Sequence, residues 1–312
     1  NTYVGGIIGY NGPSANKLFK NVNNSGDITV TGACQMLQVG GIFGSVGSVD
    51  ITIDSCTNSG DITVENAQKF NCKNGQIGGI FGVSITAATT ANLLNCTNSG
   101  DITVKNTTFD YAFAVGGICG QALYNSDNQK FRCNLNIENV TNEGDILIEN
   151  SKSAATHISV GGIVAASSAT DVTTTIKNPI QRGNITVTDS SEEGFASGIY
   201  IGGISGYLRK GSITNDSNDR GTVSGHISLT AKNVAGLPYV AGIIGSNEGL
   251  SEISDIKVIS TTTNPSSITA NIGTIASNRY FAGLVGYGDA ETAYTNLSNA
   301  APVDITLDTC TN

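Results

Sequence analysis

The sequence predicts an all-β fold, namely a single parallel β-helix (β-solenoid) of about eight coils, each of 35–45 residues and with long loops. Two short motifs alternate along the whole chain, and both read as strands joined by turns. The composition agrees, because the 312 residues include 39 glycines but only 5 prolines. Glycine allows repeated tight turns, and a low proline content leaves the backbone N–H groups free for ladder hydrogen bonds.

The first motif is a strand with a glycine pair, of the form Val-Gly-Gly-Ile-x-Gly. Its second glycines are spaced by 35, 38, 38, 45, 41, 39 and 41 residues. Strict alternation would expose either Ile7 or Ile8, and the same holds in later copies. We therefore expect a bend at the glycines, or loops packed over the outer row. The copies begin at Val4, Val39, Ile77, Val115, Val160 and Ile201, with weaker copies from Val240 and Phe281.

The second motif is a turn followed by a strand, Asn-Ser-Gly-Asp-Ile-Thr-Val in its first copy. Alternation places Ile28 and Val30 on one face of this strand and Thr29 on the other. The Asn-Ser-Gly segment before the strand has typical turn chemistry. Copies begin at Asn24, Cys56, Cys96, Val140 and Gln181, with a decayed copy from Asp219 and only the strand from Val303.

A third strand precedes the turn in several units, for example over 134–137 and 172–176. Three short strands in a unit of about 39 residues predict one coil of a β-helix, because a lone coil cannot bury its apolar face and needs stacked neighbours. The alternative is a β-propeller, which needs four strands in each blade. We interpret residues 1–312 as one domain, regular over 4–187 and degenerate over 188–312. Since the chain closes on the start of another repeat, we expect it to be a fragment of a longer chain.

Four aspartates occupy one position of the turn motif in successive units. If the coils are in register, their carboxylates recur about every 4.8 Å. One interpretation is a calcium-binding ladder, because Ca²⁺ prefers carboxylate and carbonyl oxygens; calcium is the only cofactor considered. The other is a turn residue that bonds to local backbone, and this one is favoured. The four are Asp27, Asp61, Asp101 and Asp145.

Asparagines and cysteines also recur at fixed positions. Asn24, Asn58, Asn98 and Asn142 precede the turn glycine, where stacked amides can form a ladder. Cys56 and Cys96 share one position in adjacent units. A stacking distance of about 4.8 Å suits a disulfide, but two small buried side chains fit equally well. Valine fills the same position in other units, which favours burial.

Composition limits the functional classes. The net charge is −9 and no cluster of lysine and arginine occurs, so nucleic acid is excluded as a partner. The longest apolar runs are too short to cross a membrane. Acidic residues are thinly scattered, so we predict that the chain is not an enzyme, although some β-helices degrade polysaccharides. A solvated loop explains the densest charged stretch, from Arg209 to Arg220.

Tyrosines and three long loops are the candidates for direct binding. Tyrosine rings could stack on a glycan, although Tyr10, Tyr207 and Tyr287 recur at one position and so suit packing at a strand end. The other candidates are Tyr124, Tyr200 and Tyr239. The loops at 105–115, 150–159 and 188–200 extend beyond a minimal unit and are where a local function would lie.

The two motifs together resemble the GLUG-type repeats of large bacterial surface proteins, similar to those of Bacteroidetes and Firmicutes. The resemblance covers essentially the whole chain and is clearest from Val4 to Val187. It implies an extracellular or cell-surface location and an adhesin-like role, and it assigns no catalytic residue. We therefore expect a structural or adhesive segment, a stalk or presentation scaffold. Its expected partners are neighbouring repeats or domains of the same chain and a host or cell-surface glycan or protein. Uncapped ends would also allow end-to-end self-association.

Overall fold

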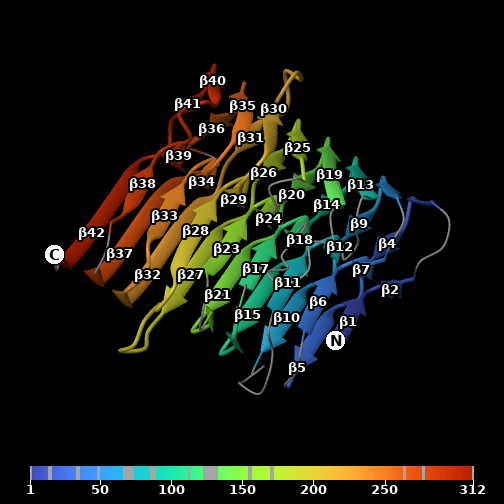
Figure 1. Cartoon of the computed structure of the whole chain (residues 1–312), viewed down its shortest axis with the longest axis horizontal. Helices are drawn as coiled ribbons and strands as arrows, with labels where there is room; N and C mark the ends of the chain where they lie inside the picture. Colours follow the sequence, from blue (N-terminus) through green and yellow to red (C-terminus); the bar gives the residue numbers. More distant parts are fainter. Residues whose placement is uncertain are drawn as a thin grey trace.

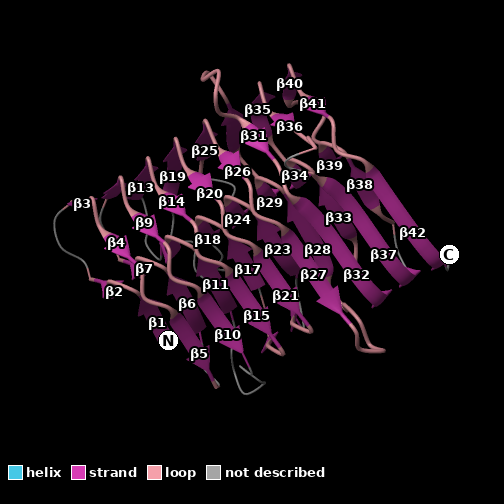
Figure 2. Ribbon diagram, turned by 180° about the vertical axis from the view of Figure 1, so that it is seen from behind, coloured by secondary structure: helices cyan, strands magenta, loops and turns pink. Residues whose placement is uncertain are grey.

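The computed structural model describes residues 2–12, 16–32, 36–47, 50–65, 74–84, 89–111, 113–121, 133–153, 157–168, 172–262, 265–275 and 278–310. The described residues form strands, turns and loops, and they contain no helix (Figure 2). Accordingly, the described part of the chain has no helix long and apolar enough to cross a membrane.

The strands form five parallel sheets of eight strands each, and every coil contributes one strand to each sheet. Along every sheet the strands follow the order of the sequence, from blue to red in Figure 1, so the first and last coils lie at opposite ends of the stack. The prediction of a parallel β-helix is confirmed, and the propeller alternative is wrong. Equivalent residues of the repeated motif pair with one another in neighbouring coils: Ile62 pairs with Ile28 on one side and with Ile102 on the other.

Sheets A and B come from the glycine-pair motif. Sheet A consists of β1 (Thr2–Gly5), β6 (Met36–Gly40), β11 (Asn74–Gly78), β17 (Phe113–Gly116), β23 (His157–Gly161), β28 (Gly198–Gly202), β33 (Pro238–Ala241) and β38 (Tyr280–Ala282). Sheet B consists of β2 (Ile8–Asn11), β7 (Phe43–Val46), β12 (Phe81–Ser84), β18 (Cys119–Gln121), β24 (Val164–Ser167), β29 (Ser205–Leu208), β34 (Ile244–Asn247) and β39 (Val285–Tyr287).

Sheets C and D precede the turn. Sheet C consists of β3 (Lys17–Lys20), β8 (Ile51–Asp54), β13 (Thr89–Leu94), β19 (Cys133–Glu138), β25 (Thr174–Lys177), β30 (Gly211–Thr214), β35 (Leu250–Ser254) and β40 (Ala293–Thr295). Sheet D consists of β4 (Asn23–Asn24), β9 (Thr57–Asn58), β14 (Thr97–Asn98), β20 (Thr141–Asn142), β26 (Ile180–Gln181), β31 (Thr222–Val223), β36 (Lys257–Val258) and β41 (Ser298–Asn299).

Sheet E follows the turn and lengthens toward the end of the chain. It consists of β5 (Ile28–Thr31), β10 (Ile62–Glu65), β15 (Ile102–Lys105), β21 (Ile146–Glu149), β27 (Ile185–Asp189), β32 (His226–Val234), β37 (Ser267–Ile275) and β42 (Val303–Cys310). One further pair, β16 (Thr108–Phe109) and β22 (Lys152–Ser153), joins the long loops of the third and fourth coils.

Each coil therefore has five strands, where the sequence predicts three. The strands of sheet D have only two residues, too few for an alternating pattern to appear. The glycine-pair motif is two strands and not one, because the chain bends at the glycines between sheets A and B.

That bend lets both apolar parities of the motif be buried, as expected. Ile42 and Phe43 are consecutive, yet neither has any exposed side chain. The bend requires glycine: a Cβ on Gly41 would lie 2.1 Å from the carbonyl oxygen of Gly79 and 2.3 Å from the side chain of Asn58. One continuous hydrophobic core runs through all coils, with Phe43 and Phe81 among its largest members.

Candidate functional site

A ladder of amide side chains runs through the core at the end of sheet D. Asn58 accepts a hydrogen bond from Asn24 Nδ2 at 2.8 Å and donates to Asn98 Oδ1 at 2.8 Å and to the carbonyl of Gly60. Asn98 donates to Asn142 in the same way, and Asn142 donates to Gln181. Asn58, Asn98 and Asn142 are fully buried, so each amide needs partners in the coils above and below it. The predicted asparagine ladder is confirmed, and Gln181 extends it by one coil.

The aspartate row lies on the surface beside this ladder. In each case the carboxylate accepts a hydrogen bond from the backbone N–H at the same position of the next coil. Asp27 binds the N–H of Asp61 at 3.0 Å, Asp61 binds that of Asp101 at 2.9 Å, and Asp101 binds that of Asp145 at 2.8 Å. The row continues through Asn184 to the N–H of His226. The aspartates thus bond to backbone, but across coils and not within their own turn.

The calcium ladder stays a prediction. In the part of the chain that the structure describes, no three histidine, cysteine or acidic side chains gather closely enough to hold a metal ion. One oxygen of each carboxylate is already engaged by backbone. Asp145 uses both of its oxygens, because Asn184 Nδ2 also donates to its second oxygen at 3.1 Å.

Cys56 and Cys96 are free, fully buried thiols, and the candidate disulfide between them is not formed. Each thiol lies near two backbone carbonyls. Cys56 Sγ is 3.4 Å from the oxygen of Asp54, and Cys96 Sγ is 3.2 Å from that of Leu94. The hydrogen bond with Cys56, together with burial, raises the pKa of the Cys96 thiol. Both cysteines therefore serve here as small core side chains.

A row of left-handed residues was not anticipated from the sequence. Seven of the coils each have one residue with a positive φ, between 51° and 58°, at the corner between sheets C and D. Asparagine and aspartate tolerate this conformation better than most residues. The signal available in the sequence was the recurrence of asparagine, serine or aspartate just after each strand of sheet C. The residues are Asn21, Ser55, Asn95, Asn139, Asn178, Asp255 and Asn296.

Tyrosines form a stacked row on the outer side of the angle between sheets A and B. Tyr239 stacks on Tyr200 and on Tyr280, with ring centroids 4.7 Å apart in both pairs and interplanar angles of 9° and 2°. Tyr207 and Tyr287 meet this row from sheet B, and the hydroxyl of Tyr207 donates to Glu248 Oε2 at 2.6 Å.

Burial governs the titration of these rings. It raises the pKa of Tyr239 to about 12, and burial together with the Glu248 carboxylate raises that of Tyr207 further. Burial also lowers the pKa of His157, whose ring meets the edge of Tyr200. Tyr239 presents neither ring face to solvent, because both faces are covered by the neighbouring rings. The prediction that Tyr10, Tyr207 and Tyr287 pack at a strand end is confirmed for Tyr207, which is buried, whereas Tyr10 and Tyr287 contact other tyrosine rings but stay exposed. Tyr239, a candidate for stacking on a glycan, is buried as well. Tyr124 lies outside the described residues.

The long loops are part of the stack where they are described. Phe109 and Phe195 are buried in the loops at 105–115 and 188–200, and Phe195 forms a bridge with Val234 of the next coil. Lys152, in the loop at 150–159, lies 3.5 Å from the buried carboxylate of Asp189. Residues 112 and 154–156 of these loops lie outside the description.

The charged residues between Arg209 and Arg220 form contacts with neighbouring coils. Arg220 reaches across two coils and donates to the carbonyls of Asn178 and Val140 at 2.7 and 2.6 Å. Asp216 binds Lys177 at 2.7 Å, and each lies on the surface. Arg209 pairs with Glu248 at 3.8 Å. These contacts tie coils together and converge on no common point.

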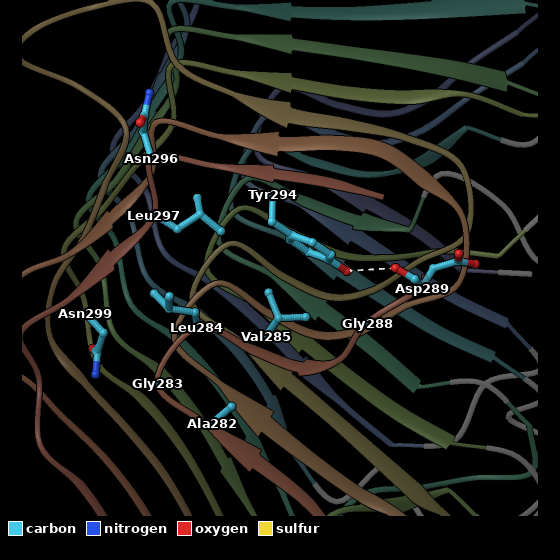
Figure 3. A pocket seen from close by; sticks show the side chains of 10 residues that line it. All are labelled: Ala282, Gly283, Leu284, Val285, Gly288, Asp289, Tyr294, Asn296, Leu297 and Asn299. Carbon is cyan, nitrogen blue, oxygen red and sulfur yellow. Dashed lines mark hydrogen bonds between the residues drawn. The ribbon is translucent and has the colours of Figure 1, made fainter. Parts of the chain in front are cut away.

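One hollow opens on the last coil, with a volume of about 820 Å³ (Figure 3). Leu284, Val285 and Leu297 line its floor, and the Tyr294 hydroxyl donates to the backbone oxygen of Asp289 at its rim. This hollow is the core of the solenoid, open because no further coil covers the last one in the structure.

Comparisons with known proteins give no relative: no family model, no curated protein and no solved structure matches the chain.

Proposed function

We propose that this chain is a rigid presentation scaffold, a structural or adhesive segment of an extracellular or cell-surface protein. The observation that carries the proposal is the in-register stacking of five sheets over eight coils. Inside the stack, buried amide side chains link successive coils by hydrogen bonds. The likeness to GLUG-type surface repeats supports the location. The proposed role is passive and assigns no catalytic residue.

The geometry suits a scaffold that presents loops on its sides better than a stalk that extends far from the cell. Each coil of about 39 residues adds only about 4.8 Å to the stack, whereas a helix adds about 1.5 Å per residue. Eight coils therefore extend about 40 Å. A chain of this length gives little extension for its size, but it provides broad sides on which loops and side-chain rows are held in fixed register.

Location is tested by protease treatment of intact cells that produce the chain, followed by detection of its fragments. Release of fragments before lysis is expected, because a surface scaffold exposes its loops to the protease. A chain that is cleaved only after lysis would contradict the proposed address.

The scaffold role is tested by hydrogen exchange. A rigid presentation segment should show slow exchange in the sheet amides of every coil and fast exchange only in loops. Rapid exchange throughout sheets A to E would contradict a scaffold.

Direct binding of a glycan or protein is the second candidate, favoured by Tyr287 at the end of the tyrosine row and by Tyr111 in a long loop, which are both exposed. A glycan array separates the two functions. Binding that is lost in Tyr111→Ala or Tyr287→Ala, while both variants stay folded, would support the binding role. A chain that binds no glycan on the array supports the passive one.

A further inference from the structure

Two buried cysteines hold equivalent positions in neighbouring coils. Cys56 directly precedes β9 and Cys96 directly precedes β14, and these strands pair in register, Thr57 with Thr97. The N–H of Thr97 binds the oxygen of Cys56 at 3.0 Å. In-register neighbours of this kind have Cα atoms about 4.8 Å apart. Disulfides join residues whose Cα atoms lie about 4.4–6.8 Å apart, so the backbone already holds this pair within range.

The two thiols also point in the same direction. Both side chains face the core, and neither is exposed. Cys56 Sγ lies 3.7 Å from the oxygen of Phe19, and Cys96 Sγ lies 3.4 Å from the oxygen of Ile53. Phe19 and Ile53 are themselves partners in sheet C, so the two sulfur atoms have equivalent surroundings one coil apart. The thiols contact each other through a hydrogen bond, which places sulfur next to sulfur.

Packing at this position does not require cysteine. In the fourth coil the same position is occupied by Val140, which directly precedes β20 and is fully buried. The N–H of Thr141 binds the oxygen of Cys96 at 2.9 Å, so this coil stacks on the third as the third stacks on the second. Free cysteine packs as a small apolar side chain, as valine does. What the cysteine pair adds to the core is therefore the reactivity of two thiols in contact.

Cys119 shows the difference between a single buried thiol and this pair. Its in-register neighbours in sheet B are Phe81 in the preceding coil and Val164 in the following coil. Cys119 is as deeply buried as Cys56 and Cys96, but no cysteine holds its position in either adjacent coil. It therefore provides a matched control for the behaviour of the pair.

The hydrogen bond between the two thiols makes them unequal. It lowers the pKa of Cys56 to about 7, whereas the same bond and burial raise the pKa of Cys96. The thiolate is the species that attacks in thiol–disulfide exchange. Cys56 is thus the thiol that reacts first, and Cys96 is the thiol that completes the bond.

We propose that Cys56 and Cys96 are a covalent crosslinking site, which a low-molecular-weight disulfide oxidises to a bond between the second and third coils. The Cys56 thiolate attacks one sulfur of the small disulfide, and the other sulfur leaves as a thiolate. Cys96 then gives up its proton and attacks Cys56 Sγ, which releases the second small thiol. Two protein thiols are thereby oxidised, and one small disulfide is reduced to two thiols.

The bond would lock two coils of the stack together. It closes a segment as long as one coil, and a crosslink of this kind stabilises a fold mainly by restricting the unfolded chain. Because both sulfur atoms are buried, the oxidant must enter by local opening of the stack, and a reductant must enter in the same way. The inference does not depend on the proposed location, although extracellular surroundings are those in which disulfides persist.

The test is oxidation of the whole chain with glutathione disulfide, followed by unfolding, alkylation of the remaining thiols and peptide mapping. Tryptic peptide 74–105, whose only cysteine is Cys96, should be recovered joined to peptide 21–69, which contains Cys56. The joined peptides should be absent from Cys56→Val, which should fold because valine fills this position in the fourth coil. Cys119→Val, which introduces the residue of the next coil in the same way, should form the bond as the wild type does.

Stability provides a second measurement. The urea midpoint of the oxidised wild type should exceed that of the reduced chain by about 1 M, given the usual gain from a disulfide and the usual dependence on denaturant. Cys56→Val should unfold at the same urea concentration before and after exposure to the oxidant.

Three results would overturn the proposal. Cys56 and Cys96 could both remain alkylatable after prolonged oxidation. Peptides 21–69 and 74–105 could still be joined in Cys56→Val, which would assign the bond to another cysteine. The midpoint could stay unchanged or fall after complete crosslinking, which would show that the bond does not fit the native stack.

Discussion

At the scale of single residues, one motif position has different physical demands in different coils. The turn glycine recurs at Gly26, Gly60, Gly100, Gly144 and Gly183, and in all but the first a Cβ would approach the oxygen of the preceding turn glycine to 2.0–2.2 Å. The glycine is thus required by the neighbouring coil and not by its own turn. The sequence shows the recurrence, but only the stack shows its cause.

This difference predicts opposite outcomes for one substitution. Gly100→Ala should lower the free energy of unfolding by about 2 kcal/mol, the usual cost of forcing an extra methyl into close-packed surroundings. Gly26→Ala should change it by less than about 0.5 kcal/mol, since its Cβ has space. Urea denaturation of both variants provides the measurement. Equal midpoints for the two would contradict the stacking account.

The aspartate row allows a second prediction at this scale. Asp61→Ala removes the acceptor for the N–H of Asp101 and should cost about 1 kcal/mol. Asp61→Asn should be close to neutral, because Asn184 already binds the N–H of His226 at 2.8 Å in the same row. Thermal melts with and without calcium measure both effects. A melting temperature that rises with calcium in the wild type and not in Asp61→Asn would revive the calcium ladder.

At the scale of elements, strands with an alternating pattern were predictable and the others were not. The strands of sheet E appear in the sequence because Ile28 and Val30, and their counterparts, alternate with threonine. Sheet D was missed because two residues cannot show a period. The long loops stay the predicted place of any local function. The sequence did not show that Phe195, in one of these loops, is buried against a strand almost 40 residues further along the chain. Sequence patterns report local periodicity, whereas this contact depends on which coil lies next in the stack.

Sheet C is tied across coils by Asp54, and this predicts a dependence on acid. Bonds from Asn95, Lys20 and Ser55 lower the pKa of Asp54 from 3.8 to about 2. A carboxyl whose pKa is lower in the folded state stabilises that state above its unfolded pKa. The contribution should be intact above pH 4 and be lost as the pH falls toward about 2.

The measurement is the free energy of unfolding between these two pH values, in the wild type and in Asp54→Asn. The variant should be less stable at neutral pH and should lose less stability on acidification. Asp219→Asn, at an exposed aspartate, is the matched control and should follow the wild type. A variant curve parallel to that of the wild type would contradict the role of Asp54.

At the scale of the whole molecule, the repeat makes stability a sum over coils and their interfaces. The parallel β-helix could be predicted from the sequence because eight copies of a strand motif need a stacked architecture to bury their apolar faces. The ladder of amides could be anticipated for the same reason, since a residue fixed in register meets its own counterpart in the next coil.

A chain built in this way should tolerate the loss of one whole coil and not of half a coil. Residues 56–64 and 96–104 have the same sequence, Cys-Thr-Asn-Ser-Gly-Asp-Ile-Thr-Val. Deleting residues 59–98 therefore joins Asn58 to Ser99 without a seam, and sheets A to E each lose one strand while the neighbours meet in register. The shortened chain should keep a β-sheet circular dichroism spectrum and unfold at a denaturant concentration close to that of the parent.

Deleting only residues 59–78 removes a strand from sheets E and A but leaves those of the other sheets, so that the following coils lose register and cooperative unfolding is lost. If the half-coil deletion proved as stable as the whole-coil deletion, the coil would not be the unit that determines the stability of this molecule.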